Sequence, residues 1–86
     1  MRLKIVRADG EETIHNITPS VEYAFELYAK KGFYRAFTDD PKMSDLYWIA
    51  WEVLRKSGVT VPTFGAAFLD TLTKVEVLGD EDSPNS

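Results

Sequence analysis

Residues 46–54 read Leu46-Tyr47-Trp48-Ile49-Ala50-Trp51-Glu52-Val53-Leu54. Their apolar residues recur at helical spacing and predict the main helix, on which the rest of the fold packs. One stripe of this helix is expected to face the core: Leu46, Ile49, Ala50, Val53 and Leu54. Tyr47, Trp48 and Trp51 widen the apolar sector beyond what one packing face needs. Some of these three rings are therefore expected to pack against neighbouring segments or against a partner.

The ends of the main helix follow from proline, glycine and charge. Asp39-Asp40-Pro41 predicts its start, because proline at the first helical position lacks only an amide that would have no helical partner there. Arg55-Lys56-Ser57-Gly58 predicts its end. Just before this helix, Phe33-Tyr34-Arg35-Ala36-Phe37 predicts one or two further helical turns, with Phe33 and Phe37 on the same face.

An earlier helix is expected between Thr18-Pro19 and Lys30-Lys31-Gly32. Threonine is a good N-cap, and proline suits the first helical position. The two lysines complement the negative end of the helix dipole, and Gly32 is expected to supply a left-handed cap. The apolar stripe of this helix consists of Val21, Ala24, Phe25 and Tyr28.

The first seventeen residues predict a β-hairpin. Leu3-Lys4-Ile5-Val6 and Thr13-Ile14-His15-Asn16-Ile17 are both β-prone runs. Asp9-Gly10 lies between them, and both residue types tolerate the positive φ that a tight hairpin turn requires. The hairpin therefore precedes all the expected helices.

The segment after the main helix has weaker patterns. Residues 59–62 predict an extended link, and Thr63 is expected to cap a third helix that carries Phe64, Ala67, Phe68 and Leu72. Val75-Glu76-Val77 indicates a short strand. The expected fold class is thus α+β and mainly helical, an N-terminal hairpin followed by three or four short helices. Residues 1–78 would form a single globular domain, and residues 79–86 a disordered acidic tail.

Composition limits the functional classes. The chain has 86 residues, no cysteine and a formal net charge of −4. The missing cysteine excludes a disulfide framework, a thiolate metal site and a cysteine nucleophile. The acidic balance argues against nucleic-acid binding through phosphate contacts. No apolar run is long enough to span a membrane, and the N-terminus does not have the pattern of a signal peptide, so a cytoplasmic location is expected.

Few residues suggest chemistry. His15 is the one histidine, and without matched ligands it does not predict a transition-metal site. Asp39, Asp40 and Asp45 are candidates for a cation site or an acid–base pair, but their position at a helix start favours a role in capping and dipole interaction. We therefore expect no enzymatic activity, no catalytic residue, no cofactor and no metal.

Aromatic residues are the remaining candidates for function. They make up 13% of this short chain, and tryptophan and tyrosine are enriched among the residues that dominate binding energy in protein interfaces. A groove that receives an amphipathic partner helix would suit this layout. The expected partner-binding residues are Phe33, Tyr34, Phe37, Tyr47, Trp48 and Trp51.

The order of these patterns resembles the tail assembly chaperones of long-tailed, siphovirus-type bacteriophages. The resemblance covers most of the chain and begins with the Asp9-Gly10 hairpin and the helix after Thr18-Pro19. Gly32-Phe33-Tyr34-Arg35-Ala36-Phe37 follows, and the most specific run is Met43-x-x-Leu46-Tyr47-Trp48-Ile49-Ala50-Trp51-Glu52. A helix with Phe64 and Phe68-Leu69-Asp70, then Val75-Glu76-Val77 and an acidic tail, complete it.

The resemblance implies a chaperone that binds the tape measure protein and keeps it soluble until the tail tube polymerises around it. It implies action in the host cytoplasm, absence from the mature virion, and a second partner in the form of a longer, frameshifted version of the same protein. Ser83-Pro84-Asn85 can be encoded by a slippery heptamer, which is consistent with programmed frameshifting. The family provides no catalytic residues, and a homo-oligomer stays open.

Three other functional classes stay open from the sequence. A structural virion protein, such as a head–tail connector or a tail completion protein, would be found in purified particles. A small phage regulator would bind one host protein or nucleic acid. A hydrolase that uses the three aspartates with a metal ion would be stabilised by divalent cations.

Overall fold

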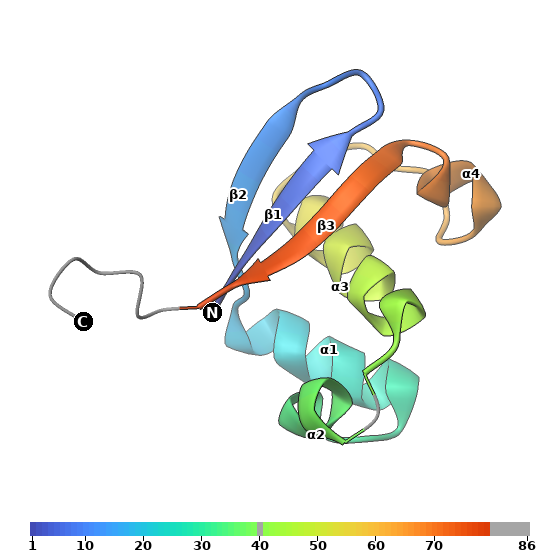
Figure 1. The fold of residues 1–86 in the computed structure, drawn as a ribbon. Helices are drawn as coiled ribbons and strands as arrows, with labels where there is room; N and C mark the ends of the chain where they lie inside the picture. The colour runs from blue at the N-terminus through green and yellow to red at the C-terminus, as the bar shows by residue number, and fades with distance from the viewer. Residues whose placement is uncertain (40, 80–86) are drawn as a thin grey trace, which may run out of the picture.

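A computed structural model describes residues 1–39 and 41–79 of the chain. These residues form an antiparallel sheet and, packed on one face of it, a set of short helices (Figure 1). The α+β class expected from the sequence is confirmed, although the sheet holds more of the chain than a mainly helical fold implies. Asp40 and residues 80–86, which hold nearly all of the expected acidic tail, lie outside the described residues.

The expected N-terminal hairpin is confirmed. Strands β1 (Arg2–Arg7) and β2 (Glu12–Asn16) pair antiparallel, with Leu3 opposite His15. Gly10 has φ of 94°, and its amide donates to the carbonyl of Arg7 at 2.9 Å, so glycine fits this turn without strain. The hairpin register follows from local turn chemistry.

The strand expected near the C-terminus is longer than its apolar core suggested. β3 (Leu72–Leu78) pairs antiparallel with β1, which becomes the central strand in the order β2-β1-β3. Val77 lies opposite Leu3 and Val75 opposite Ile5, and the register shifts between Val6 and Arg7. The two ends of the described chain are therefore joined in one sheet.

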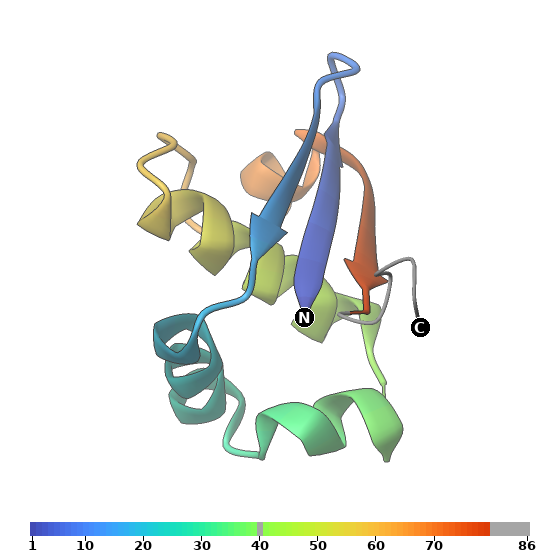
Figure 2. The ribbon, with the colours of Figure 1, turned by 90° about the vertical axis from the view of Figure 1, so that its left-hand side faces the viewer.

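Among residues 1–39 and 41–79, the helices cover one face of the sheet. Leu3 and Ile5 of β1 are fully buried on the inner face, and Val75 beside them is 6% exposed. On the outer face, Lys4 and Glu12 form a 3.5 Å ion pair, and both side chains are partly exposed to solvent. In Figure 2 α3 and α4 pass behind the strands and α1 and α2 lie below them, so no helix lies in front of the sheet.

The first helix, α1 (Pro19–Ala29), begins where the sequence predicts. The Thr18 side chain accepts from the amide of Val21, which is the expected N-cap bond. Its C-terminal end differs from the expectation, because Lys30 adopts the left-handed cap with φ of 62° and Gly32 instead precedes the next helix in an extended conformation. The left-handed cap of α1 therefore lies at Lys30, two residues before Gly32.

Of the two central helices, α2 agrees with the sequence prediction and α3 begins later than predicted. α2 (Phe33–Thr38) is the expected short helix. The main helix, α3 (Met43–Lys56), begins at Met43, so the predicted start at Asp39-Asp40-Pro41 is wrong. The N-cap Lys42 makes no side-chain capping bond, and Asp45 lies in the first turn, where its charge favours the helix dipole.

The predicted third helix is reduced to one turn. α4 comprises only Ala66–Leu69, and Gly65 rather than Thr63 occupies its N-cap position. Leu72, expected on this helix, instead starts β3. Phe68 anchors the turn because its side chain is fully buried. A single hydrophobic core joins the sheet to all four helices of the described chain.

Helix α3 lies at the centre of the helical layer. Its buried residues surround much of the helix axis: Asp45, Trp48, Ile49, Ala50, Glu52, Val53 and Leu54. It packs against α1 and β3, so it has more than one interior face. The wide apolar sector seen in the sequence is explained by this central position. No helix among residues 1–39 and 41–79 has the length and apolar character to cross a membrane.

Candidate protein-binding surface

The six aromatic residues singled out from the sequence occupy different environments. Phe33 and Trp48 are only 3% and 7% exposed and belong to the core. Tyr34 is 71% exposed. The remaining three are half-buried against the core: Phe37, Tyr47 and Trp51. Phe33 and Trp48 therefore cannot present their rings to a partner in this conformation, because neighbouring elements already cover them.

Four rings form a continuous cluster at the junction of α1, α3 and the connection before α4. Tyr28 of α1 stacks on Trp48 of α3, with centroids 4.5 Å apart and planes inclined by 10°. Trp51 lies 5.8 Å from Trp48 and 6.1 Å from Phe64. Phe64 also meets Tyr28 edge-on at 6.5 Å. Such offset and edge-to-face pairs stabilise beyond simple burial.

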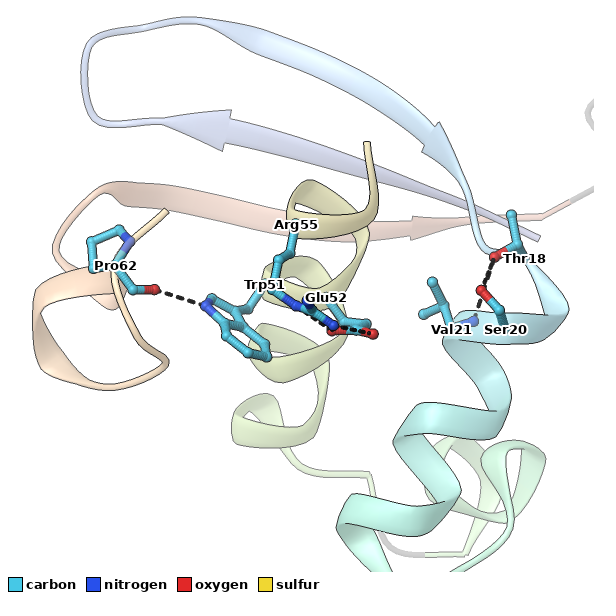
Figure 3. A network of polar contacts seen from close by, with 7 residues as sticks. All are labelled: Thr18, Ser20, Val21, Trp51, Glu52, Arg55 and Pro62. Atoms are coloured by element: carbon cyan, nitrogen blue, oxygen red, sulfur yellow. Dashed lines mark hydrogen bonds and ion pairs between the residues drawn. The ribbon is translucent and has the colours of Figure 1, made fainter. Parts of the chain in front are cut away.

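Polar contacts fix the outer part of this cluster. The Trp51 indole nitrogen donates to the Pro62 carbonyl at 2.8 Å and holds the connection against α3 (Figure 3). The Arg55 guanidinium lies 5.3 Å from the Trp51 ring centroid and donates two bonds of 3.0 Å to the Glu52 carboxylate. Trp51 is thus held in one orientation from both sides.

Helix α1 adds an exposed apolar stripe that the sequence analysis missed. Tyr23, Leu27 and Tyr28 are 65%, 57% and 52% exposed. Tyr23 and Leu27 are four residues apart and share one face of the helix, and Tyr28 leads from them to the ring cluster. The signal available in the sequence was the position of Tyr23 and Leu27 opposite Val21 and Phe25, whereas Tyr28 was expected in the core stripe and is instead half exposed.

We name this surface the aromatic face. It combines the exposed stripe of α1 with the outer rings of the cluster and consists of Tyr23, Leu27, Tyr28, Trp51 and Phe64. Three of the seven large hydrophobic residues that are markedly exposed in the described chain lie on this one helix. Clustered apolar exposure of this kind marks interaction sites in soluble proteins.

Two of the three aspartates considered as a cation site, Asp39 and Asp45, form ion pairs with different cations, and Asp40 lies outside the described residues. Asp39 accepts from Arg35 at 2.8 Å, and Asp45 pairs with Lys31 at 2.7 Å. Among residues 1–39 and 41–79, no three histidine or acidic side chains lie close enough together to hold a metal ion. Asp39 and Asp45 thus act in ion pairs, and Asp39 does not cap α3.

His15 lines a separate hollow of about 280 Å³ with Val21, Val53 and Lys56. Its Nε2 atom lies 2.9 Å from the Thr13 hydroxyl. Burial lowers the pKa of His15 below its ordinary value of 6.5. The folded chain therefore favours the neutral ring.

This burial predicts a pH effect on stability. The contribution of His15 to the free energy of unfolding is fully present above its unfolded-state pKa and is lost as the pH falls through the lower folded-state pKa. His15→Gln should therefore flatten the decline in unfolding free energy between about pH 7 and about pH 5. Urea unfolding across this range measures the slope, and Asn16→Gln in the same strand should keep it. Identical slopes for wild type and His15→Gln would contradict this assignment.

Comparison of the chain with protein-family models, with curated proteins and with solved structures found no match.

Proposed function

We propose that this chain is a chaperone that binds another protein through the aromatic face and performs no catalytic step. The observation that carries the proposal is the apolar exposure of α1, where Tyr23 and Leu27 are both more than half exposed and Tyr28 of the same helix belongs to the ring cluster. Rings held by packing lose little conformational freedom on binding, and this favours them as anchors. The surface therefore suits an apolar helix or strand of a client.

We propose the tape measure protein of a long-tailed phage as the client. The support is the resemblance of the hairpin, the helix order and the Tyr47-Trp48-Ile49-Ala50-Trp51 run to tail assembly chaperones. A temporary cover needs a modest apolar surface that a later partner can displace, rather than the large apolar interface of a permanent complex. In this proposal the chain acts in the host cytoplasm and is absent from the finished virion.

Purification of the tagged chain from phage-producing cells tests the client. Mass spectrometry should identify the tape measure protein among the bound proteins, and purified particles should lack the chain. A longer, frameshifted form of the chain would be a further expected partner. Recovery of a capsid or tube protein, or of one host enzyme, in place of the tape measure protein would contradict this function.

Variants of exposed residues test the surface. Tyr23→Gln combined with Leu27→Gln should weaken binding of a tape measure fragment by about tenfold or more, because the stripe loses its two most exposed apolar groups. Isothermal titration calorimetry measures the dissociation constant. Ile14→Thr is the matched control, since Ile14 is 52% exposed but lies on β2. Equal affinity of the α1 variant and the control would exclude the aromatic face.

Tyr34→Gln separates this surface from the one expected from the sequence. Tyr34 is the most exposed of the large hydrophobic residues and lies on α2, outside the aromatic face. We expect its replacement to change client affinity less than the α1 variant does. The reverse order would assign binding to the α2 region.

A further inference from the structure

Strand β3 is paired on one side only. Within the described residues it bonds to β1, and no other strand lies along its outer edge. In Figure 2 it is the outermost strand on the right, and no helix lies beyond it. An edge strand offers a row of unpaired backbone donors and acceptors, and another strand can satisfy them.

The sequence of β3 is complementary to itself when it is reversed. Leu72-Thr73-Lys74-Val75-Glu76-Val77-Leu78 has Val75 at its centre, lysine on one side and glutamate on the other, and leucine at both ends. In an antiparallel pair that is centred on Val75, Lys74 of each copy lies opposite Glu76 of the other. Opposite charges in directly facing positions stabilise such a pair.

We propose that a second copy of this chain pairs with β3 edge to edge, antiparallel, with the two Val75 residues facing each other. Lys74 and Glu76 both point to the outer face of the sheet, as Lys4 does in the same register. Val75 and Val77 point to the inner face. Two ion pairs therefore form on the outer face, and on the inner face Val75 meets Val75 while Val77 lies opposite Thr73.

An apolar hollow lies beside one end of β3. It measures about 130 Å³ and is lined mainly by apolar side chains: Phe37, Pro41, Met43, Leu46 and Val77. The one strand residue in its lining is Val77, so the hollow lies beside the Val77 end of β3. The symmetry axis of an antiparallel pair is perpendicular to the sheet, which brings the helical layers of both copies to one side. In this register the two Val77 residues lie on opposite sides of the central Val75 pair, so the two hollows lie on the same side of the joined sheet, near opposite ends of the paired strands.

The opposite edge of the sheet lacks this complementarity. Reversal of β2 about Ile14 places Glu12 opposite Asn16 and Thr13 opposite His15, so no ion pair forms between the copies. Lys4 already pairs with Glu12 within the chain. Charge complementarity thus selects β3 as the edge that associates.

Charge reversal tests the register. Lys74→Glu alone, or Glu76→Lys alone, places like charges opposite each other twice in the pair, and each should weaken self-association by about tenfold or more. The double variant Lys74→Glu/Glu76→Lys should regain wild-type association. Sedimentation equilibrium of the full chain over a range of concentrations measures the dimer constant, and thermal unfolding confirms that each variant is folded.

A mixture of the two single variants separates contact between copies from contact within one. Lys74 and Glu76 already lie 3.7 Å apart in the same strand, so each single variant also creates a like-charge neighbour within its own chain. Mixing the two variants does not remove this repulsion within each chain, but it places the glutamates of one chain opposite the lysines of the other. The mixture should therefore form a mixed dimer that neither variant forms alone.

Three results would overturn the proposal. The first is a wild-type chain that stays monomeric at its highest soluble concentration, which would mean that Lys74 keeps the edge strand unpaired. The second is dimerisation of both single variants as strong as that of the wild type. The third is the absence of a mixed dimer when the two single variants are combined. None of these results bears on client binding by the aromatic face, because β3 contributes no residue to that face.

Discussion

Trp48→Ala is expected to lower the free energy of unfolding by about 3–5 kcal/mol, which is a large share of the total for a small domain. Trp48 is 7% exposed. Its ring centroid lies 4.5 Å from that of Tyr28, 6.1 Å from that of Phe25 and 5.8 Å from that of Trp51. Its removal leaves a cavity between α1 and α3 and takes away the ring on which Tyr28 stacks. Urea unfolding followed by far-UV circular dichroism measures the loss.

Tyr34→Ala is the matched control for this prediction. Both residues were expected from the sequence to contact a partner, but Tyr34 is 71% exposed and its replacement should change stability by about 0.5 kcal/mol or less. Similar losses for the two variants would show that Trp48 does not lie in the core. Because Trp48→Ala also removes support from Tyr28, any loss of client binding in that variant is an indirect effect.

Arg55→Ala is expected to lower the free energy of unfolding by about 2–3 kcal/mol. Glu52 is only 2% exposed, and Arg55 donates both of its bonds to that carboxylate. Removal of one partner from a buried ion pair leaves an uncompensated charge, which costs about 3–5 kcal/mol in a fully buried site. The expected value is smaller because the Arg55 side chain is 51% exposed and water can reach part of the pair.

Two companion variants isolate the role of the charge. Arg55→Lys keeps a cation near Glu52 but loses the two-pronged geometry and the guanidinium contact with the Trp51 ring, so it should recover only part of the stability. Arg55→Ala combined with Glu52→Gln removes the unpaired charge and should be more stable than Arg55→Ala alone. Chemical denaturation measures all three, and a double variant no more stable than the single one would contradict the buried-charge explanation.

The sequence predicted those elements whose structure depends on neighbouring residues. The hairpin turn at Asp9-Gly10 and the start of α1 at Thr18-Pro19 are fixed by backbone conformation and capping, which act over a few residues. The buried stripe of α3 from Ile49 to Leu54 also followed from helical spacing. Such local signals allowed the α+β class to be predicted.

Predictions failed where a helix end depends on contacts with distant residues. Proline at position 41 indicated a helix start, yet α3 begins at Met43, and Asp45 in its first turn is paired with Lys31 from the connection between α1 and α2. The helix expected from Thr63 gave way to the strand that starts at Leu72, because pairing with β1 satisfies the backbone there. Propensity is a weak guide where tertiary contacts compete with it.

The candidate binding surface shows the same division. The sequence by itself determined that the chain has more aromatic residues than one helical face can bury, and it placed most of them correctly on helices. It could not determine which rings are covered, because the burial of Phe33 and Trp48 depends on α1, α2 and α3 meeting in space. Only the tertiary structure left Tyr23 and Leu27 exposed and brought β3 beside β1, since both results require contacts between segments far apart in the chain.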